Sequence, residues 1–192
     1  MDVDLSTNSW MQIANAALAQ ISADILSTFN DGSLTATYVT TLLPIALDEV
    51  YGTLPLDDIS LYANLARNGN YKPESSGYTY SYIIPPKCAF VREVVVEPEG
   101  TDWKRVRGAI LTNASAVRVR YVQKPSTPND MPPYCRSLLI TLLASKLAGA
   151  LNHDASLSST LLSQYQSQLS QFLVLREAPG AQPTYREVEA WV

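Results

Sequence analysis

The 192-residue sequence is poor in the residue types that build most catalytic and metal centres. It holds one histidine, His153, and two cysteines, Cys88 and Cys135. These two cysteines suit neither a disulfide framework nor a zinc-ligand spacing, so we expect both to be small buried hydrophobic residues. His153 lies in Asn152-His153-Asp154, between two predicted helices, where an exposed turn residue is expected. The sequence has no glycine-rich phosphate loop and no nucleophile elbow, and it predicts no catalysis, no metal site and no cofactor.

Long apolar runs are also missing. The longest uncharged apolar stretch, residues 137–145, is too short to cross a bilayer. The first ten residues, MDVDLSTNSW, contain two acids and no Lys or Arg, unlike the basic start of a secretory signal. With 46% hydrophobic and 17% charged residues, the chain is typical of a soluble globular protein. We expect one domain over residues 1–176 and no membrane contact.

Positive charge is absent from the first third of the chain. Residues 1–66 hold eight acids and no Lys or Arg, whereas residues 92–124 hold seven bases against four acids. One interpretation is that both regions are solvated faces that keep the protein in solution. The other is complementary docking between copies or onto partners.

Helical spacing of apolar residues occupies both ends of the domain. The N-terminal block, residues 9–66, shows one stripe from Trp10 to Ile21, a second from Val39 to Leu54 with Pro44 inside it, and a shorter helix over 56–66. The C-terminal block, residues 132–176, begins at two prolines and predicts a helical hairpin.

In the middle of the chain, over residues 78–124, the spacing of apolar residues changes from the helical period of 3.6 to the strand period of 2. Val117, Val119 and Tyr121 alternate with Arg118 and Arg120, a pattern typical of a half-buried antiparallel strand. Partner strands are predicted at residues 90–96, 103–107 and 109–112. The expected fold class is therefore mainly α (α+β): a helical bundle with an inserted small antiparallel β-sheet and an extended C-terminal tail.

The last predicted helix has no charge at all between residues 155 and 175, where its polar positions are serine, threonine and glutamine. An ordinary exposed helix carries Lys and Glu, and neutral side chains are removed from water at lower cost than ions. This favours a contact between subunits over a bare solvent face. The expected intersubunit residues are Gln164, Gln168, Gln171, Arg118 and Arg120.

Residues 177–192 lose the helical periodicity and are expected to form a flexible C-terminal docking tail. Its separated apolar residues Tyr185, Val188 and Trp191 would lie on one side of a helix formed on a partner. Two alternatives remain open. The tail is either a frayed terminus or a clasp that packs on its own bundle.

Several short segments together resemble a family of phage proteins. They are Tyr80, Tyr82, Ile84 and Pro86 at the start of the insertion, the strand around Trp103, the Leu111-Thr112-Asn113 turn, the strand Val119-Arg120-Tyr121-Val122, and the helix after Pro132-Pro133 that ends in residues 147–151. They look like those of the head–tail adaptor (connector) proteins of tailed bacteriophages, of the tail tubular protein A kind found in podoviruses. The resemblance extends from Trp10 to about Leu173, and the C-terminal tail is outside it.

This resemblance implies a structural virion protein at the head–tail junction, assembled in the host cytoplasm. The family forms a ring, usually of twelve copies, that attaches beneath the portal protein and receives the tail or nozzle protein. Double-stranded genomic DNA would pass through its channel without specific binding. The tail residues Tyr185, Val188 and Trp191 would then dock on the portal.

A nucleic-acid-binding module is the alternative function. Arg105, Arg107, Arg118 and Arg120 would line one basic face of the β insertion, with Tyr121 or Trp103 nearby for base stacking. The sequence pI of about 4.9 argues against DNA affinity as the main function.

Overall fold

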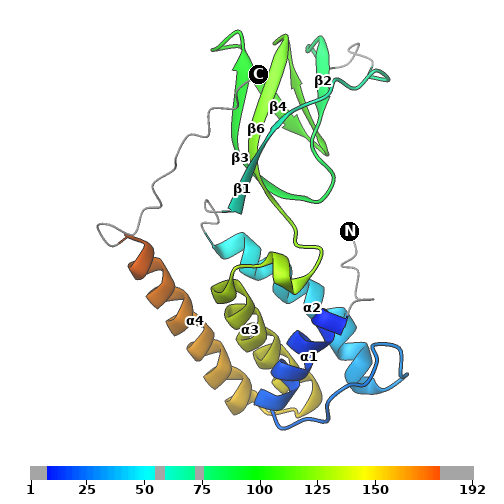
Figure 1. Ribbon diagram of the computed structural model, residues 1–192, viewed down its shortest axis with the longest axis vertical. Coiled ribbons are helices and arrows are strands. Elements are labelled where there is room, and N and C mark those ends of the chain that lie inside the picture. The colour runs from blue at the N-terminus through cyan, green and yellow to red at the C-terminus, as the bar shows by residue number, and fades with distance from the viewer. Residues whose placement is uncertain (1–7, 55–58, 72–75, 178–192) are drawn as a thin grey trace. The chain divides into compact units, whose positions relative to one another are not determined.

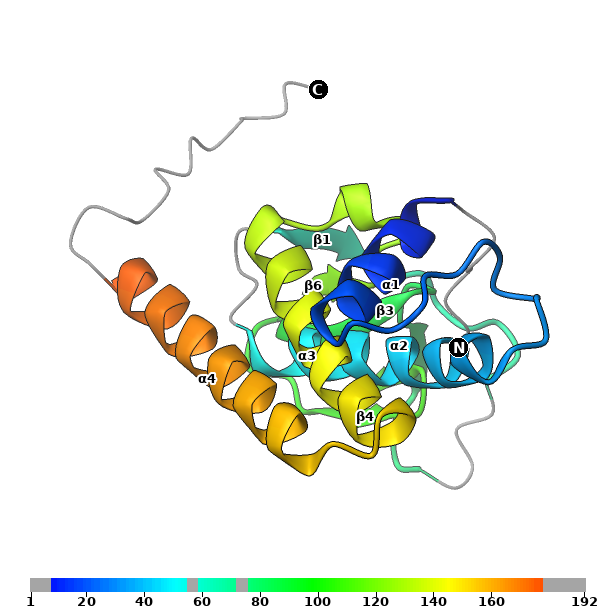
Figure 2. The ribbon, with the colours of Figure 1, turned by 90° about the horizontal axis from the view of Figure 1, so that it is seen from below.

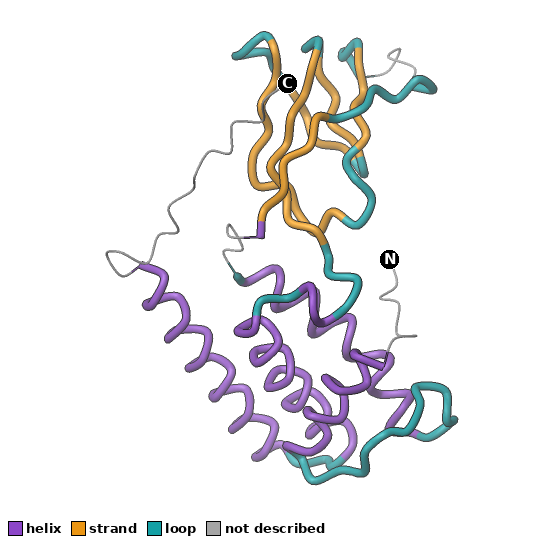
Figure 3. Tube along the Cα trace, viewed as in Figure 1, coloured by secondary structure: helices purple, strands orange, loops and turns teal. Residues whose placement is uncertain are grey.

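The computed structural model describes residues 8–54, 59–71 and 76–177, which form two compact units. One unit comes from residues 55–124 and carries the strands (Figure 3). The other joins residues 2–54 to residues 125–192 and carries the long helices. The helical unit is therefore assembled from two segments that are separated in the sequence by the whole β unit.

Four α-helices build the described part of the helical unit (Figure 1). They are α1 (Asn8–Gln20), α2 (Leu34–Thr53), α3 (Pro133–Leu151) and α4 (Ala155–Glu177), with a short 3-10 helix, η3 (Pro128–Asp130), before α3. α3 contacts each of the other three α-helices, and Figure 2 shows α4 running along one side of it. Its leucines Leu139, Leu142, Leu143 and Leu147 are completely buried. α3 is thus the core helix of this unit.

Local sequence explains where two of these helices begin. Ser33 caps α2, because its hydroxyl accepts a hydrogen bond of 3.0 Å from the main-chain N–H of Ala36. α2 then continues through Pro44 to Thr53 without a break. α3 begins at Pro133, where the missing N–H of proline costs no helical hydrogen bond.

Polar side chains fix two loops of the helical unit. Asn15 on α1 donates to the carbonyl of Leu26 at 3.0 Å and accepts from the N–H of Leu26 at 2.9 Å. The indole N–H of Trp10, whose side chain is buried, donates to the carbonyl of Ser126 at 3.2 Å. Both contacts satisfy main-chain groups of irregular segments that pack against helices.

Six strands form the described part of the β unit. They are β1 (Ser60–Asn64), β2 (Tyr80–Ile83), β3 (Cys88–Glu97), β4 (Trp103–Val106), β5 (Ala109–Thr112) and β6 (Ala116–Gln123). They form two antiparallel sheets, ordered β1-β6-β3 and β2-β5-β4. Tyr82 and Ile110 from one sheet share a buried cluster with Val117, Val119 and Tyr121 from the other. The two sheets therefore bury their apolar faces against each other.

The predicted alternation along β6 is confirmed. Val117, Val119 and Tyr121 are buried, Arg118 is exposed and Arg120 is half-buried. The helical hairpin at the C-terminal end is also confirmed as α3 and α4. β6 alternates apolar and charged residues, and the two helices carry leucines at helical spacing, so the sequence was enough to predict these segments.

The predicted fold class is wrong. The structure is 47% helix and 23% strand, and it holds two three-stranded antiparallel sheets in place of one small sheet inserted in a bundle. It is a mixed α+β fold. The strands β1 and β2 are four or five residues long, so neither carries enough period to be recognised without its partner strand.

The prediction of a short helix over residues 56–66 is wrong for the residues of this range that the structure describes. Residues 60–64 form β1, which pairs along its whole length with β6. The first helical block accordingly ends at Thr53 and not at residue 66. Pairing with a distant strand outweighs local helical preference in such a short segment. The single domain over residues 1–176 stays a prediction, because two compact units can belong to one folding domain.

α3 is long and apolar enough to cross a membrane when judged by length and composition alone. Of the window that meets this test, 56% is buried inside the structure. A buried core helix of a soluble protein meets the same test, so the expected absence of membrane contact stays a prediction.

Replacement of Asn15 by alanine should destabilise the helical unit. The substitution removes both hydrogen bonds to the main chain of Leu26 and leaves a partly buried N–H and carbonyl unpaired. We expect the free energy of unfolding to fall by about 1–3 kcal/mol, measured by urea denaturation. Gln12→Ala, an exposed change on the same helix, is the control and should have an effect below about 0.5 kcal/mol. Equal losses from the two variants would contradict a role for this contact.

Candidate functional site

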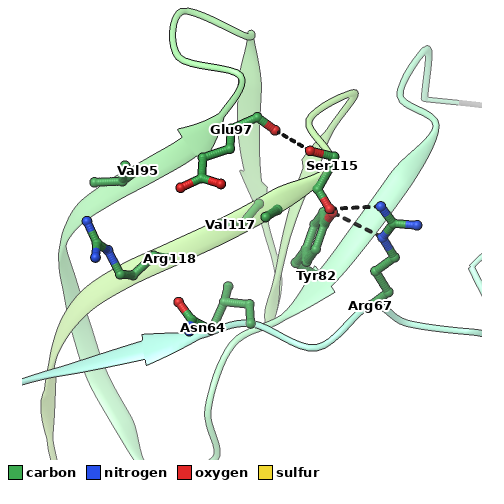
Figure 4. Close-up of a pocket in the computed structure, with 10 residues that line it drawn as sticks. Asn64, Arg67, Tyr82, Val95, Glu97, Ser115, Val117 and Arg118 are labelled. Atoms are coloured by element: carbon green, nitrogen blue, oxygen red, sulfur yellow. Dashed lines mark hydrogen bonds between the residues drawn. The ribbon is translucent and has the colours of Figure 1, made fainter. Parts of the chain in front are cut away.

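The β unit has an open groove of about 510 Å³ on one side (Figure 4). Its walls combine charged, polar and apolar residues from four strands, β1, β2, β3 and β6. The lining residues are Asn64, Leu65, Arg67, Tyr82, Val95, Glu97, Ser115, Ala116, Val117 and Arg118. Both signs of charge are present, so the groove has no strong preference for anions or cations.

Arg67 and Tyr82 form a hydrogen-bond network at one end of this groove. The Nε atom of Arg67 donates to the Tyr82 hydroxyl at 3.1 Å, and Nη2 donates to the carbonyl of Ser115 at 2.8 Å. The Tyr82 hydroxyl lies 2.9 Å from the carbonyl of Ala114 and 2.7 Å from that of Ser115, and it donates toward them. The Arg67 guanidinium lies 4.1 Å from the centre of the Tyr80 ring.

This network holds Arg67 and Tyr82 in place at one end of the groove. The hydrogen bond to Tyr82 raises the pKa of Arg67 above its usual value, so Arg67 keeps its charge. Every polar atom that the network uses is directed at another part of the same unit. Sequence reasoning did not identify Arg67, because its partners lie up to 48 residues away along the chain.

The four arginines of the predicted basic face do not lie on one sheet. Arg118 and Arg120 are on β6, while Arg105 is on β4 of the other sheet and Arg107 follows β4 in a turn. Arg120 pairs with Glu93 on the adjacent strand at 3.3 Å. The charge of Arg120 is therefore offset by an acid on the adjacent strand β3, whereas Arg118 has no ion pair within the described residues.

The aromatic residues expected beside those arginines also differ in exposure. Tyr121 is only 8% exposed and belongs to the core between the sheets, whereas Trp103 on β4 is 43% exposed. A base can stack only on a ring that it can reach. Tyr121 is therefore unavailable for stacking, and Trp103 is available.

The glutamines predicted to lie between subunits are all on α4 but differ in exposure. Gln164 and Gln171 are exposed. Gln168 is half-buried, and its side-chain oxygen is buried with no hydrogen-bond partner in the described part of the chain. Gln164 and Gln171 are thus free to meet a neighbouring molecule, while Gln168 contributes to packing within the unit.

Three of the exposed serines of α4 are hydrogen-bonded to the helix itself. Ser159, Ser163 and Ser170 each donate their hydroxyl to a main-chain carbonyl three or four residues earlier, at 2.8–2.9 Å. Leu162 and Val174 on the same helix are 40% and 68% exposed. Covering this face would therefore remove no charge from water and few unpaired hydroxyl donors.

A small apolar groove of about 270 Å³ lies between α3 and the C-terminal half of α4. The rings of Tyr134 on α3 and Phe172 on α4 stack there, with centres 4.0 Å apart and planes at 20°. Gln168 and Gln171 form part of its wall. The structure thus brings together two of the predicted intersubunit residues, beside an aromatic pair that no sequence signal identified.

Of the two cysteines expected to be buried, only Cys135 is fully buried. Cys135 is buried and Cys88 is half-buried, where burial raises the pKa of its thiol although the nearby Arg105 opposes this effect. His153 is exposed, with a φ of 52°, in the turn between α3 and α4. Within the described ranges, no group of three His, Cys, Asp or Glu side chains could hold a metal ion. The tail residues Tyr185, Val188 and Trp191 lie outside the described residues.

Comparison with known proteins finds no family model that matches this chain and no curated protein that matches it. Functional inference therefore depends on the surfaces described above and on the resemblance carried by the residues themselves.

Removal of the Tyr82 hydroxyl should destabilise the β unit. Tyr82→Phe leaves the ring in the core but removes the hydrogen bonds to Arg67 and to the carbonyls of Ala114 and Ser115. We expect a loss of about 1–3 kcal/mol in the free energy of unfolding, measured in urea with the near-ultraviolet circular dichroism signal. Tyr62→Phe, at a residue that is 68% exposed on β1, should leave the free energy unchanged. An unchanged midpoint of urea unfolding for Tyr82→Phe would show that the hydrogen bonds of the Tyr82 hydroxyl do not stabilise the fold.

Proposed function

We propose that this protein is a structural subunit of a phage virion that assembles into a ring at the head–tail junction. The ring connects the portal protein to the tail or nozzle protein, and genomic DNA passes through it without specific binding. The subunit performs no catalysis and needs no cofactor. The copy number follows from the resemblance, which implies twelve.

The observation that carries this proposal is the exposed face of α4. It has no charged residue between positions 155 and 175, and it exposes Leu162 and Val174. The hydroxyls of Ser159, Ser163 and Ser170 are bonded within the helix. Such a face loses little hydration energy when it is covered. Subunit contacts are typically depleted in charged residues at their centre, as this face is.

The overall charge also supports passage of DNA. The formal net charge is −4, and a wall of that sign holds phosphates less tightly than a basic wall would. Arg118, an expected intersubunit residue, is exposed, and the structure gives it no ion pair in the described part of the chain. It therefore has a charge available for a neighbouring subunit.

The alternative of a nucleic-acid-binding module has less support. Its four arginines are divided between two sheets, and Arg120 is paired with Glu93. A continuous basic patch is the usual footprint of DNA affinity. Such affinity would also fall steeply as salt is added, whereas an adaptor would bind DNA weakly in every buffer.

Two negative charges placed on the glutamine side of α4 should prevent ring assembly. In the Gln164→Glu/Gln171→Glu variant, the new carboxylates lie seven residues apart on the same side of the helix. Burying them between copies without partners costs several kcal/mol, so we expect a folded monomer by native mass spectrometry and electron microscopy, alone and mixed with portal protein.

Gln12→Glu/Ala19→Glu is the matched control for this variant. It adds the same two charges at the same spacing of seven residues, at exposed positions of α1 instead of α4. We expect it to keep its rings. Intact rings from Gln164→Glu/Gln171→Glu would reject the assignment of the contact to this side of α4.

Deletion of residues 180–192 tests the proposed docking tail. Because these residues include Tyr185, Val188 and Trp191, we expect the truncated protein to keep its thermal midpoint but to lose attachment to the portal. The measurement is co-sedimentation with portal particles, beside a melting curve. A truncated protein that melts several degrees lower and still binds portal would show that the tail is a clasp on its own subunit.

A further inference from the structure

Within the described residues, β3 has a free edge with unpaired main chain, and this edge lies beside a groove. β3 is the outer strand of the sheet ordered β1-β6-β3. The carbonyl of Glu97 accepts from the N–H of Ser115 at the start of β6, so the main-chain groups of Glu97 face β6. The backbone direction alternates along an antiparallel strand, and Val96 and Val94 therefore turn their N–H and carbonyl groups to the free edge. This edge can accept another strand.

The groove along that edge has a volume of about 440 Å³ and an acidic rim. It is lined by β3 residues Glu93 to Val96 and by the following turn, Glu99 to Trp103. Glu93 is paired with Arg120 at 3.3 Å. Glu99 and Asp102 are exposed, and the structure gives neither of them an ion pair within the described residues. Two carboxylates are thus available to a basic segment.

A basic edge strand is present on the same unit. β4 is the outer strand of the sheet ordered β2-β5-β4, and all four of its side chains are exposed. Lys104 and Arg105 lie on it and Arg107 follows it. No ion pair is recorded for these three residues in the part of the chain that the structure describes. β4 is therefore a free, positively charged edge.

The charges select which edges can meet between two copies. A β3 edge facing a second β3 edge would bring acids together, and a β4 edge facing a second β4 edge would bring bases together. Only β4 of one copy against β3 of another places opposite charges across the contact. Charges of the same sign on β3 and β4 would be sufficient to prevent these edges from pairing between copies. The two edges instead carry opposite charges.

We propose that β4 of one subunit docks along the free edge of β3 in the next subunit, with Lys104 and Arg105 facing Glu99 and Asp102. The contact adds a strand to the β1-β6-β3 sheet of the neighbour. It joins two different surfaces, so it is a head-to-tail contact, which closes into a ring when its rotation divides a full turn. This inference rests on the proposed function, because it assigns a second contact to the same ring.

A charge-swap experiment tests this contact. Variant one is Lys104→Glu/Arg105→Glu and variant two is Glu99→Lys/Asp102→Lys, and all four positions are exposed. Each variant alone would place like charges across every contact, so we expect the ring species to be lost in native mass spectrometry. An equimolar mixture of the two variants restores opposite charges at every contact of an alternating ring. We expect rings of even copy number from that mixture.

Mixtures of either variant with wild-type protein are the matched control. Each such mixture keeps repulsive contacts between some neighbours, so it should form fewer rings than the mixture of the two variants. Far-ultraviolet circular dichroism melting establishes that both variants are folded. Rings formed by either folded variant alone, or folded variants that form no rings when mixed, would overturn the β4–β3 contact.

The outcomes also separate this inference from the proposed function. If the charge-swap variants keep their rings while Gln164→Glu/Gln171→Glu loses them, only the β4–β3 contact is rejected. If wild-type protein forms no ring, alone or with portal, both the contact and the proposed function are rejected.

Discussion

The burial of α3 is the constraint on which the arrangement of the helical unit depends. Its leucines are completely removed from water, and α1, α2 and α4 all pack on it. α1 and α2 come from the chain before the β unit and α4 from the chain after it, so the unit forms only when these distant segments meet around α3. Each buried leucine contributes about 1.5–3 kcal/mol, which offsets the entropy cost of joining the segments.

Packing on α3 also decides what α4 presents to its surroundings. Leu161 and Tyr165 are buried on the α3 side, so the serines, Gln164 and Gln171 are left on the exposed side. In the β unit, mutual burial of the two sheet faces has a similar result. It buries the apolar residues but, among the described strands, leaves the outer edges of β3 and β4 without a partner strand. In both units, the surfaces proposed for assembly are those that internal packing leaves uncovered.

Sequence reasoning succeeded for segments whose own apolar residues recur at helical or strand spacing. It failed for segments whose secondary structure is set by pairing with a distant strand. The alternation of Val117, Val119 and Tyr121 identified β6, and the long apolar stripes identified α3 and α4. The sequence predicts a helix over residues 60–64 because no local feature marks them as a strand. They form a strand because they pair with β6. The strands predicted at residues 103–107 and 109–112 are present as β4 and β5, but the four-residue strand β2 was not predicted, and neither was its pairing with β5 in a second sheet.

The sequence by itself determined the composition of the candidate surfaces: an uncharged last helix, a basic segment around Lys104 and Arg105, and acids at Glu99 and Asp102. Tertiary structure decided which of these residues are available. It buried the Gln168 oxygen, exposed Gln164 and Gln171, paired Arg120 with Glu93, and divided four arginines between two sheets. The physical reason is that residue type is local, whereas exposure and partner choice are set by contacts between segments far apart in the chain.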